Sequence, residues 1–332
     1  MLLSIVIPHY NIPKQMLKRC IDSIIGQSIP DEEYEVIIVD DGSLERPSWI
    51  KDEYPGYNIT LINSDHGGPG HARNKGIDEA RGKYIQFIDA DDYLLPNGQL
   101  TQCLAMLETE RPQILRFGYK VKTDDNPETT RPRTVKFSNT ISGAIFMRDN
   151  NLSGSPCTYF FLKSLVVENN IRFPERLFHE DEEFNTILHY HAQTLVVSDA
   201  QPYCYRIREG STTANRSKEF ENRRIENMFT IIEHIAAYAH QHAAYANTIQ
   251  TDGITHKLRM LCVDVILNQM FDNRSANEIY DECAARLKPL GLFPLAKANY
   301  SLKYKLFRSL ANNRTGMKIL RLITPRKKPT KR

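Results

Sequence analysis

Short apolar runs alternate with helical patterns through the first ninety residues, and this alternation constrains the fold more than any other feature. Each run has the length and the β-branched content of a buried strand. The predicted strands cover residues 2–8, 35–39, 59–62 and 84–88. Predicted helices over 14–26 and from about 69 to 81 separate them, with a short one over 47–53. Strands that alternate with helices predict an α/β fold with an open, mostly parallel sheet flanked by helices.

Polar residues follow the predicted strands at the points where the strands end. Such a sheet binds ligands in the crevice at the carboxyl ends of its strands. Those ends carry Pro8-His9-Tyr10, Asp40-Asp41 and Asp89-Ala90-Asp91-Asp92. The sequence therefore predicts a site at this edge of the sheet.

The strand over 84–88 runs directly into three acids. If it stays extended, Asp89 and Asp91 point to one face and Asp92 to the other. Two like charges about 4 Å apart repel by roughly 4 kcal/mol at an effective dielectric near 20. A divalent cation between them relieves this repulsion, and Mg²⁺ or Mn²⁺ suits carboxylates that share it with substrate phosphates. The alternative is a solvated acidic turn.

The cluster Gly67-Gly68-Pro69-Gly70 lacks the lysine and hydroxyl ending of a phosphate loop and the spacing of a dinucleotide fingerprint. A glycine-rich turn at a helix N-terminus still holds anions, and Arg73 would add a charge-assisted donor. The alternative places Arg73 in a surface ion pair. Tyr10 can lay its ring on a nucleobase or lie at the rim of a site. Asp40 and Asp41 can accept hydrogen bonds from a base imide or from ribose hydroxyls.

The rest of the chain divides into a mixed part and a helical part. In the mixed part, the predicted helices are 97–110, 142–150, 163–170 and one that begins at 179–183, and the predicted strands are 113–121, 159–162, 194–197 and 203–207. A polar loop is expected over 124–132. After Ser211 only helical patterns remain, over 220–240, 255–271 and 276–287. The expected organisation is a domain over 1–216, a helical extension over 217–295 and a basic amphipathic tail over 296–332.

Blocks of residues in this order and spacing resemble the family 2 glycosyltransferases of the GT-A fold. Any one block is a weak signal, but five in order are highly specific. The resemblance extends from Met1 to about Arg208 and does not cover the helical end. The blocks are SIVIPHYN over 4–11, VDDGS over 39–43, ARNKGI over 72–77, ARGKYI over 80–85 with FIDADD over 87–92, and HED over 179–181.

The resemblance implies transfer of a hexosyl or N-acetylhexosaminyl group from a nucleotide-sugar, usually a UDP-sugar, with inversion at the anomeric carbon. The acceptor would be a hydroxyl of a glycan or of a lipid-linked glycan. Carried over by position, the residues that line the uridine and phosphate pocket would be Pro8, Tyr10, Asp40 and Arg73, with Asp41 nearby.

The resemblance also implies the catalytic residues. Asp91 would bind Mn²⁺ or Mg²⁺, with Asp89 near the ribose and the metal, and His179 as a further candidate ligand. Asp181 would be the general base, supported by Glu180 and His179. A carboxylate that takes the proton of the acceptor hydroxyl contributes typically 10²–10⁴-fold. This base must face the sugar ring from the side opposite the leaving group, so a distant part of the chain is expected to supply it.

A basic segment follows the second acidic block. Tyr205-Arg206-Ile207-Arg208 resembles a tyrosine-arginine segment that family members often carry near the site. We hypothesise that Arg206 or Arg208 meets the diphosphate or an anionic acceptor. The alternative is a basic strand edge.

The C-terminal charge is one-sided. Eleven of the 43 basic residues lie from Lys303 to Arg332 without an acid among them, so the rest of the chain carries 32 basic and 40 acidic residues, a net charge of −8. An amphipathic basic helix suits an anionic bilayer surface. The alternatives are a packed C-terminal helix and a nucleic-acid arm, for which aromatic residues are sparse. The apolar stripe of this segment is Leu302, Leu306 and Leu310, continued by Met317 and Leu320.

Six scattered cysteines argue against structural zinc and a disulfide framework and fit a reducing cytosol. No apolar run reaches the length of a membrane span. We therefore expect a cytoplasmic protein, peripheral on the inner face of the cell membrane. Two rival classes share the same pocket. A nucleotidyltransferase normally shows a basic glycine-rich motif near its N-terminus, which residues 8–11 lack. A protein that only binds nucleotide-sugars would not need Asp181 and Asp91.

Overall fold

The computed structural model describes residues 1–96, 98–123, 139–150, 152, 154–207, 217–270, 274–298 and 301–324. These residues form two compact units. The first contains 1–146 with the described part of 153–214, and the second contains 147–152 with the described part of 215–332. The polar loop expected over 124–132 lies outside the described residues.

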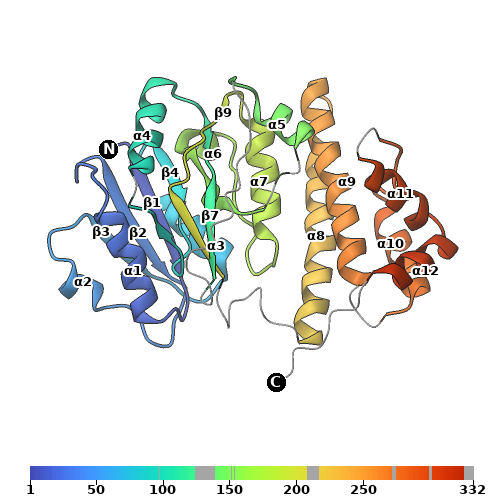
Figure 1. Cartoon of the computed structure of the whole chain (residues 1–332), viewed down its shortest axis with the longest axis horizontal. Coiled ribbons are helices and arrows are strands. Elements are labelled where there is room, and N and C mark those ends of the chain that lie inside the picture. Colours follow the sequence, from blue (N-terminus) through green and yellow to red (C-terminus); the bar gives the residue numbers. More distant parts are fainter. Residues whose placement is uncertain are drawn as a thin grey trace. The chain divides into compact units, whose positions relative to one another are not determined.

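A seven-stranded sheet forms the centre of the first unit, in the order β3-β2-β1-β4-β8-β6-β9 (Figure 1). The first four strands are mutually parallel, whereas β8 runs antiparallel to both of its neighbours. The strands are β1 (Leu3–His9), β2 (Tyr34–Asp40), β3 (Ile59–Asn63), β4 (Tyr84–Phe87), β6 (Ile114–Arg116), β8 (Tyr159–Leu162) and β9 (Leu195–Val197). The predicted open, mostly parallel sheet is confirmed.

Helices cover this sheet, and glycine allows one of them to approach closely. A side chain at Gly76 of α3 would place its Cβ 2.2 Å from a methyl carbon of Val6, in β1. The helices of this part of the chain are α1 (Lys14–Ile25), α2 (Ile50–Glu53), α3 (Pro69–Glu79), α4 (Gln99–Thr109), α5 (Gly143–Asp149), α6 (Lys163–Glu168) and α7 (Glu180–His191), with a 3₁₀ turn over Pro156–Thr158.

The first strand continues one residue beyond Pro8, where it was predicted to end. Pro8 pairs in register with Val39 of β2. The carbonyl of Val6 faces β4 and accepts from Ile88, so Pro8, two residues on, also faces the β4 side. Because β4 ends at Phe87, no ladder hydrogen bond is missing where proline lacks its N–H.

The single strand predicted over 113–121 is wrong. The backbone leaves the large sheet after β6, where Phe117 N–H donates to Thr158 and Gly118 N–H donates to Ala200. It then enters a second sheet of three strands in the order β5-β10-β7. These strands are β5 (Tyr93–Leu94), β7 (Tyr119–Thr123) and β10 (Tyr203–Ile207).

The second unit is helical in its described part, and α8 and α9 pack along each other (Figure 1). Residues 296–324, expected as a separate tail, belong to this unit, and Met317 and Leu320 are buried in it. No helix in the described part of the chain is long and apolar enough to cross a membrane. The helices are α8 (Lys218–His242), α9 (Thr248–Met270), α10 (Ala276–Leu287), α11 (Leu302–Ala311) and α12 (Arg314–Ile323).

Candidate active site

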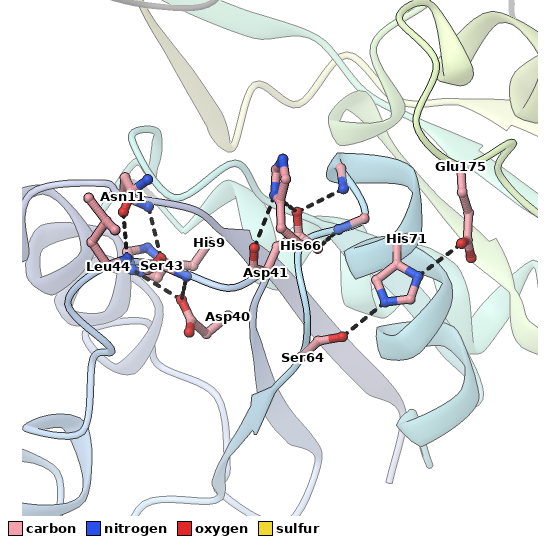
Figure 2. Close-up of polar contacts among 12 residues, drawn as sticks. His9, Asn11, Asp40, Asp41, Ser43, Leu44, Ser64, His66, His71 and Glu175 are labelled. Carbon is pink, nitrogen blue, oxygen red and sulfur yellow. Dashed lines mark hydrogen bonds and ion pairs between the residues drawn. The ribbon is translucent and has the colours of Figure 1, made fainter.

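Asp41, just after β2, holds the glycine turn that begins α3. Its carboxylate accepts hydrogen bonds from Gly67 N–H at 2.9 Å and Gly68 N–H at 2.8 Å, and lies 2.8 Å from Nδ1 of His66 (Figure 2). Gly68 has φ +90°, a conformation that favours glycine. Asp41 was predicted beside the donor pocket, and these contacts occupy its two oxygens with the protein itself.

Asp40 and His9 lie together at the ends of β2 and β1, with 3.9 Å between Asp40 Oδ1 and His9 Nε2 (Figure 2). Their side chains are 0% and 3% exposed. Burial lowers the pKa of His9, and Asp40 opposes this only in part, so the imidazole is neutral at neutral pH. Asp40 Oδ2 and His9 Nδ1 have no hydrogen-bond partner in the described part of the chain. Buried polar atoms of this kind indicate a ligand or water that completes them.

Tyr10 offers an aromatic face beside these strand ends. Its ring stacks on His66, with 4.2 Å between centroids and 21° between planes. Both side chains are exposed, Tyr10 by 45%. The pair forms a flat rim of the kind on which a nucleobase stacks. His66 and His9 were not predicted as site residues; only their places beside Tyr10 and the glycine cluster hinted at them.

His71, in the first turn of α3, connects two further segments of the site. Its Nε2 lies 2.9 Å from the hydroxyl of Ser64, after β3, and its Nδ1 lies 3.0 Å from Glu175 (Figure 2). The contact with Glu175 lacks the geometry of a hydrogen bond. His71 thus ties the end of β3 to the segment that leads into α7.

Arg73 joins the two acidic motifs. Its Nη1 lies 2.7 Å from Glu180 Oε1 and its Nη2 lies 3.1 Å from Asp89 Oδ1. The guanidinium also packs on the ring of Phe173, 5.4 Å from the centroid. Burial alone would lower the pKa of Arg73, but Asp89 and Glu180 together raise it, so the charge is permanent. This bridge is buried, so Arg73 is not in a surface ion pair, and its predicted role toward the phosphates stays a prediction.

Glu180 is buried with Arg73 at the start of α7. Its side chain is 10% exposed. Burial raises the pKa of Glu180, while Arg73 lowers it. A carboxylate held in this way positions α7 and does not reach out to a substrate. Its supporting role beside Asp181 stays a prediction.

The backbone after β4 turns instead of staying extended. Asp92 N–H donates to the carbonyl of Asp89 at 2.9 Å, so the premise that Asp89 and Asp91 share one face of a strand is wrong. Asp92 is 1% exposed and accepts from Tyr203 Oη and from Arg206 N–H at 2.7 Å. Burial, reinforced by Asp89, raises the pKa of Asp92. Asp92, not predicted as a site residue, fastens β10 to the acidic turn.

Arg206 and Arg208 were the two residues expected to bind an anion, and the structure describes only Arg206. The backbone N–H of Arg206 is used by Asp92. Arg208 lies outside the described residues. The side-chain role of Arg206 stays a prediction.

The described residues contain no preformed metal site, that is, no group of three or more His, Cys, Asp or Glu side chains able to hold an ion. Asp89, Asp91 and His179 therefore do not gather into a three-ligand set. Asp89 retains a side chain that is 35% exposed although it pairs with Arg73. Carboxylates that supply only one or two ligands suit Mg²⁺ or Mn²⁺ when phosphate oxygens supply others. The residues present fit such a shared site.

Asp181 lies in the first turn of α7, next to Glu180. Its charge lies close enough to Arg73 to contribute to the raised pKa of the guanidinium. A Cβ added at Gly154 would lie 2.9 Å from Asp181 Oδ2, so the carboxylate packs against the backbone there. Acids from the end of β4 and from the start of α7 thus lie around Arg73.

Known glycosyltransferases resemble this chain in sequence. Residues 4–168 match the family model described as glycosyl transferase family 2. The uncharacterized glycosyltransferase EpsJ of Bacillus subtilis is 28% identical over 64% of this chain and 63% of its own length. The poly(ribitol-phosphate) beta-glucosyltransferase of Bacillus spizizenii is 29% identical over 63% of this chain and 32% of its own length. The chain thus spans less than two thirds of these curated relatives.

Solved structures share the fold. Staphylococcus aureus TarS 1–349, crystallised with UDP-GlcNAc, superimposes with a TM-score of 0.62 at 22% identity, over 97% of this chain and 92% of that one. The mannosyltransferase PcManGT of Pyrobaculum calidifontis, solved with GDP-Man and Mn²⁺, gives 0.52 at 15% identity, over 97% and 87%. From the motifs, the sheet order and these likenesses, the chain belongs to glycosyltransferase family 2 and has the GT-A fold.

Proposed function

We propose that this chain is an inverting glycosyltransferase that moves a sugar from a UDP-sugar to a hydroxyl of a glycan or lipid-linked glycan. The bridge from Arg73 to Asp89 and Glu180 carries this proposal, because it brings the strand-end acids and the α7 acids to one place. The structure of TarS with UDP-GlcNAc supports UDP as the nucleotide. Relatives named as glucosyl- and N-acetylglucosaminyltransferases support a hexosyl or N-acetylhexosaminyl group.

The donor pocket in this proposal lies over the ends of β1 and β2. Asp40 Oδ2 is buried and has no donor among the described residues, and the imide N–H of uracil can supply one. Tyr10 gives the base a ring face, and Pro8 lies in β1 beside it. Asp41 acts through the glycine turn, which it holds in place.

Asp181 is the general base in this mechanism. The acceptor hydroxyl gives its proton to Asp181 as its oxygen forms a bond to the anomeric carbon. The bond from that carbon to the diphosphate breaks on the opposite face, so the configuration inverts and UDP leaves. Arg73 and Glu180 fix the first turn of α7 and thereby the position of Asp181.

Asp91 and Asp89 are the residues that would hold Mn²⁺ or Mg²⁺ together with oxygens of the diphosphate. Such a cation, when bound, neutralises the negative charge that develops on the leaving group. The presence of Mn²⁺ in the mannosyltransferase of the same fold supports this choice of cation.

The proposed acceptor is part of a surface polysaccharide or of a lipid-linked precursor. Curated relatives include enzymes named for poly(ribitol-phosphate) and for minor teichoic acid biosynthesis, which supports an extended anionic glycan. We place the protein in the cytoplasm, in peripheral contact with the anionic inner face of the membrane through its basic C-terminal region.

Thermal unfolding with different nucleotide-sugars, each with and without Mn²⁺, tests the donor. A donor at 100 times its Kd should add about 2.7 kcal/mol to the free energy of unfolding. Hydrolysis of the stabilising donor then tests the chemistry. Asp181→Asn should keep the stabilisation and lose at least about 100-fold in rate, whereas Glu183→Gln, in the same helical turn, should keep both.

Two outcomes would overturn the proposal. If Asp181→Asn hydrolysed the donor as fast as the wild type does, Asp181 would not be the general base. Stabilisation by nucleotide-sugars without hydrolysis or transfer would favour a binding protein, and release of pyrophosphate from a nucleoside triphosphate and a sugar phosphate would favour a nucleotidyltransferase.

A further inference from the structure

Helices α11 and α12 carry large apolar side chains on their outer surfaces. On α11, Leu302 is 82% exposed and Leu306 is 61% exposed. On α12, Leu322 is 84%, Ile323 is 65% and Ile319 is 43% exposed. Spacings of three and four residues place each set on one face of its helix. The two helices pack against each other (Figure 1), and each carries one exposed apolar face.

The inner faces of these helices are well anchored. Tyr304 and Ala311 of α11 are buried and so are Met317 and Leu320 of α12. Tyr304 Oη donates to the carbonyl of Ala296 at 3.1 Å. Each helix therefore packs on the unit through its inner face. Its outer apolar face has no partner in the described part of the chain.

This arrangement corrects the stripe expected from the sequence. Met317 and Leu320 were placed with Leu302 and Leu306 on one apolar side. They are buried instead. The exposed apolar face of α12 is formed by Ile319, Leu322 and Ile323, which the stripe did not include.

Positive charge surrounds the exposed apolar side chains. From Cys283 to Arg332 the chain has fourteen basic residues and no acid. Arg286 and Arg314 are neutralised by acids of α8 and α10. Lys303, Lys305 and Lys318 are exposed and form no ion pair in the described residues.

The lysines of α11 flank its leucines. At 100° per residue, Lys303 lies on one side of the Leu302–Leu306 stripe and Lys305 on the other. Lysines in this position keep their ammonium groups in the headgroup layer while their methylenes extend the apolar surface. Beyond Thr324 the sequence adds five more basic residues in its last eight.

From these observations we infer that α11 and α12 form a docking surface for an anionic bilayer. The leucines and isoleucines enter the boundary between headgroups and acyl chains, and the lysines bind acidic headgroups. A second copy of the chain is the other apolar partner to consider, but two such faces would bring like charges together. The inference rests on the membrane contact of the proposed function and assigns that contact to these two helices; its purpose is to bring the enzyme to a lipid-linked acceptor.

Sedimentation of the full chain with vesicles tests the surface. We expect binding to phosphatidylcholine vesicles that contain phosphatidylglycerol, and much weaker binding to phosphatidylcholine alone. The double variant Leu322→Ser, Ile323→Ser should lose at least about tenfold in vesicle affinity. Tyr245→Ser, 90% exposed in the same unit, is the matched control and should bind as the wild type does. Equal binding by the double variant and the wild type would overturn the inference.

Charge variants supply a second measurement. The pair Lys303→Gln, Lys305→Gln should weaken binding by about fivefold for each lysine. The pair Lys51→Gln, Lys218→Gln changes the net charge equally at exposed positions outside the basic C-terminal region and should have a much smaller effect. If both pairs of substitutions weakened vesicle binding equally, binding would depend on the total charge of the chain. That result would overturn the inference of a defined docking surface.

Light scattering and donor stabilisation separate the remaining outcomes. A wild-type dimer that Leu322→Ser, Ile323→Ser converts to a monomer would overturn the inference in favour of self-association. The same variant should keep its stabilisation by a UDP-sugar. Loss of vesicle binding with donor stabilisation retained therefore concerns this surface alone, and a chain that binds vesicles but no nucleotide-sugar would refute the proposed sugar transfer and leave the surface standing.

Discussion

Arg73 Nη1 lies 2.7 Å from Glu180 Oε1, although 107 residues separate them along the chain. The same guanidinium reaches Asp89 at 3.1 Å with its other terminal nitrogen. One buried cation therefore sets the distance between the end of β4 and the start of α7. In the proposed mechanism these two segments carry the diphosphate side and the acceptor side of the reaction.

Replacing Arg73 by methionine should lower the free energy of unfolding by about 3–5 kcal/mol, because Glu180 would remain buried without its partner. Urea unfolding measures this change. Arg172→Met removes a largely exposed pair with Asp78 and should cost less than about 1 kcal/mol. The double variant Arg73→Met, Glu180→Gln should recover part of the loss, and strictly additive losses would contradict the pairing.

Removing the carboxylate of Asp92 should loosen β10. Asp92→Ala leaves the hydroxyl of Tyr203 and the N–H of Arg206 without their acceptor, at about 1–3 kcal/mol for each buried group. Amide exchange in β10 should accelerate more than exchange in β1. Asp52→Ala, at an exposed position of α2, is the control. Unchanged exchange in β10 would show that the strand is held by its sheet neighbours alone.

The buried histidine of β1 should make stability depend on pH. Burial lowers the pKa of His9 below its ordinary value near 6.5, so the unfolded chain binds the proton more readily. Stability is then lost as the pH falls through 6.5, by at most about 1.4 kcal/mol per pH unit. His9→Gln should lose less stability than the wild type between pH 7.5 and 5.5, measured by urea unfolding. His240→Gln, exposed on α8, should follow the wild-type profile, and a profile unchanged by His9→Gln would contradict the neutral imidazole.

Local patterns predicted the elements whose partners are near in sequence. The parallel core from β1 to β4 follows from apolar runs that alternate with helices. The second sheet was missed because β10 joins Tyr119 and Tyr93 from distant segments, and no pattern in 113–121 marks the break at Gly118. Pairing between distant strands depends on the burial of the assembled fold, which a single segment does not carry.

The residues of the candidate site were likewise predicted only in part. Motif spacing predicted roles for Asp40, Asp89 and Asp181 that stay predictions, and the structure joins Asp89 to the start of α7 through Arg73. It did not identify Asp92 as a fastener, because that role depends on Tyr203, 111 residues away. It did not identify His9 either, since the significance of His9 lies in its complete burial beside Asp40.

Gly154 should control the position of the proposed base. A Cβ there would lie 2.9 Å from Asp181 Oδ2 and 2.8 Å from Glu182 Oε1, closer than carbon and oxygen approach without displacement. Gly154→Ala should therefore shift the first turn of α7 and lower kcat by about tenfold or more, since a displacement of 1 Å costs up to about 100-fold. Stabilisation by the donor should stay the same, because the proposed donor pocket lies over β1 and β2. Gly98→Ala has open space around its Cβ but φ +69°, so it should cost about 1 kcal/mol of stability and leave kcat unchanged. A normal kcat in Gly154→Ala, measured by donor hydrolysis, would mean that the carboxylate packed against Gly154 is not the one that receives the proton.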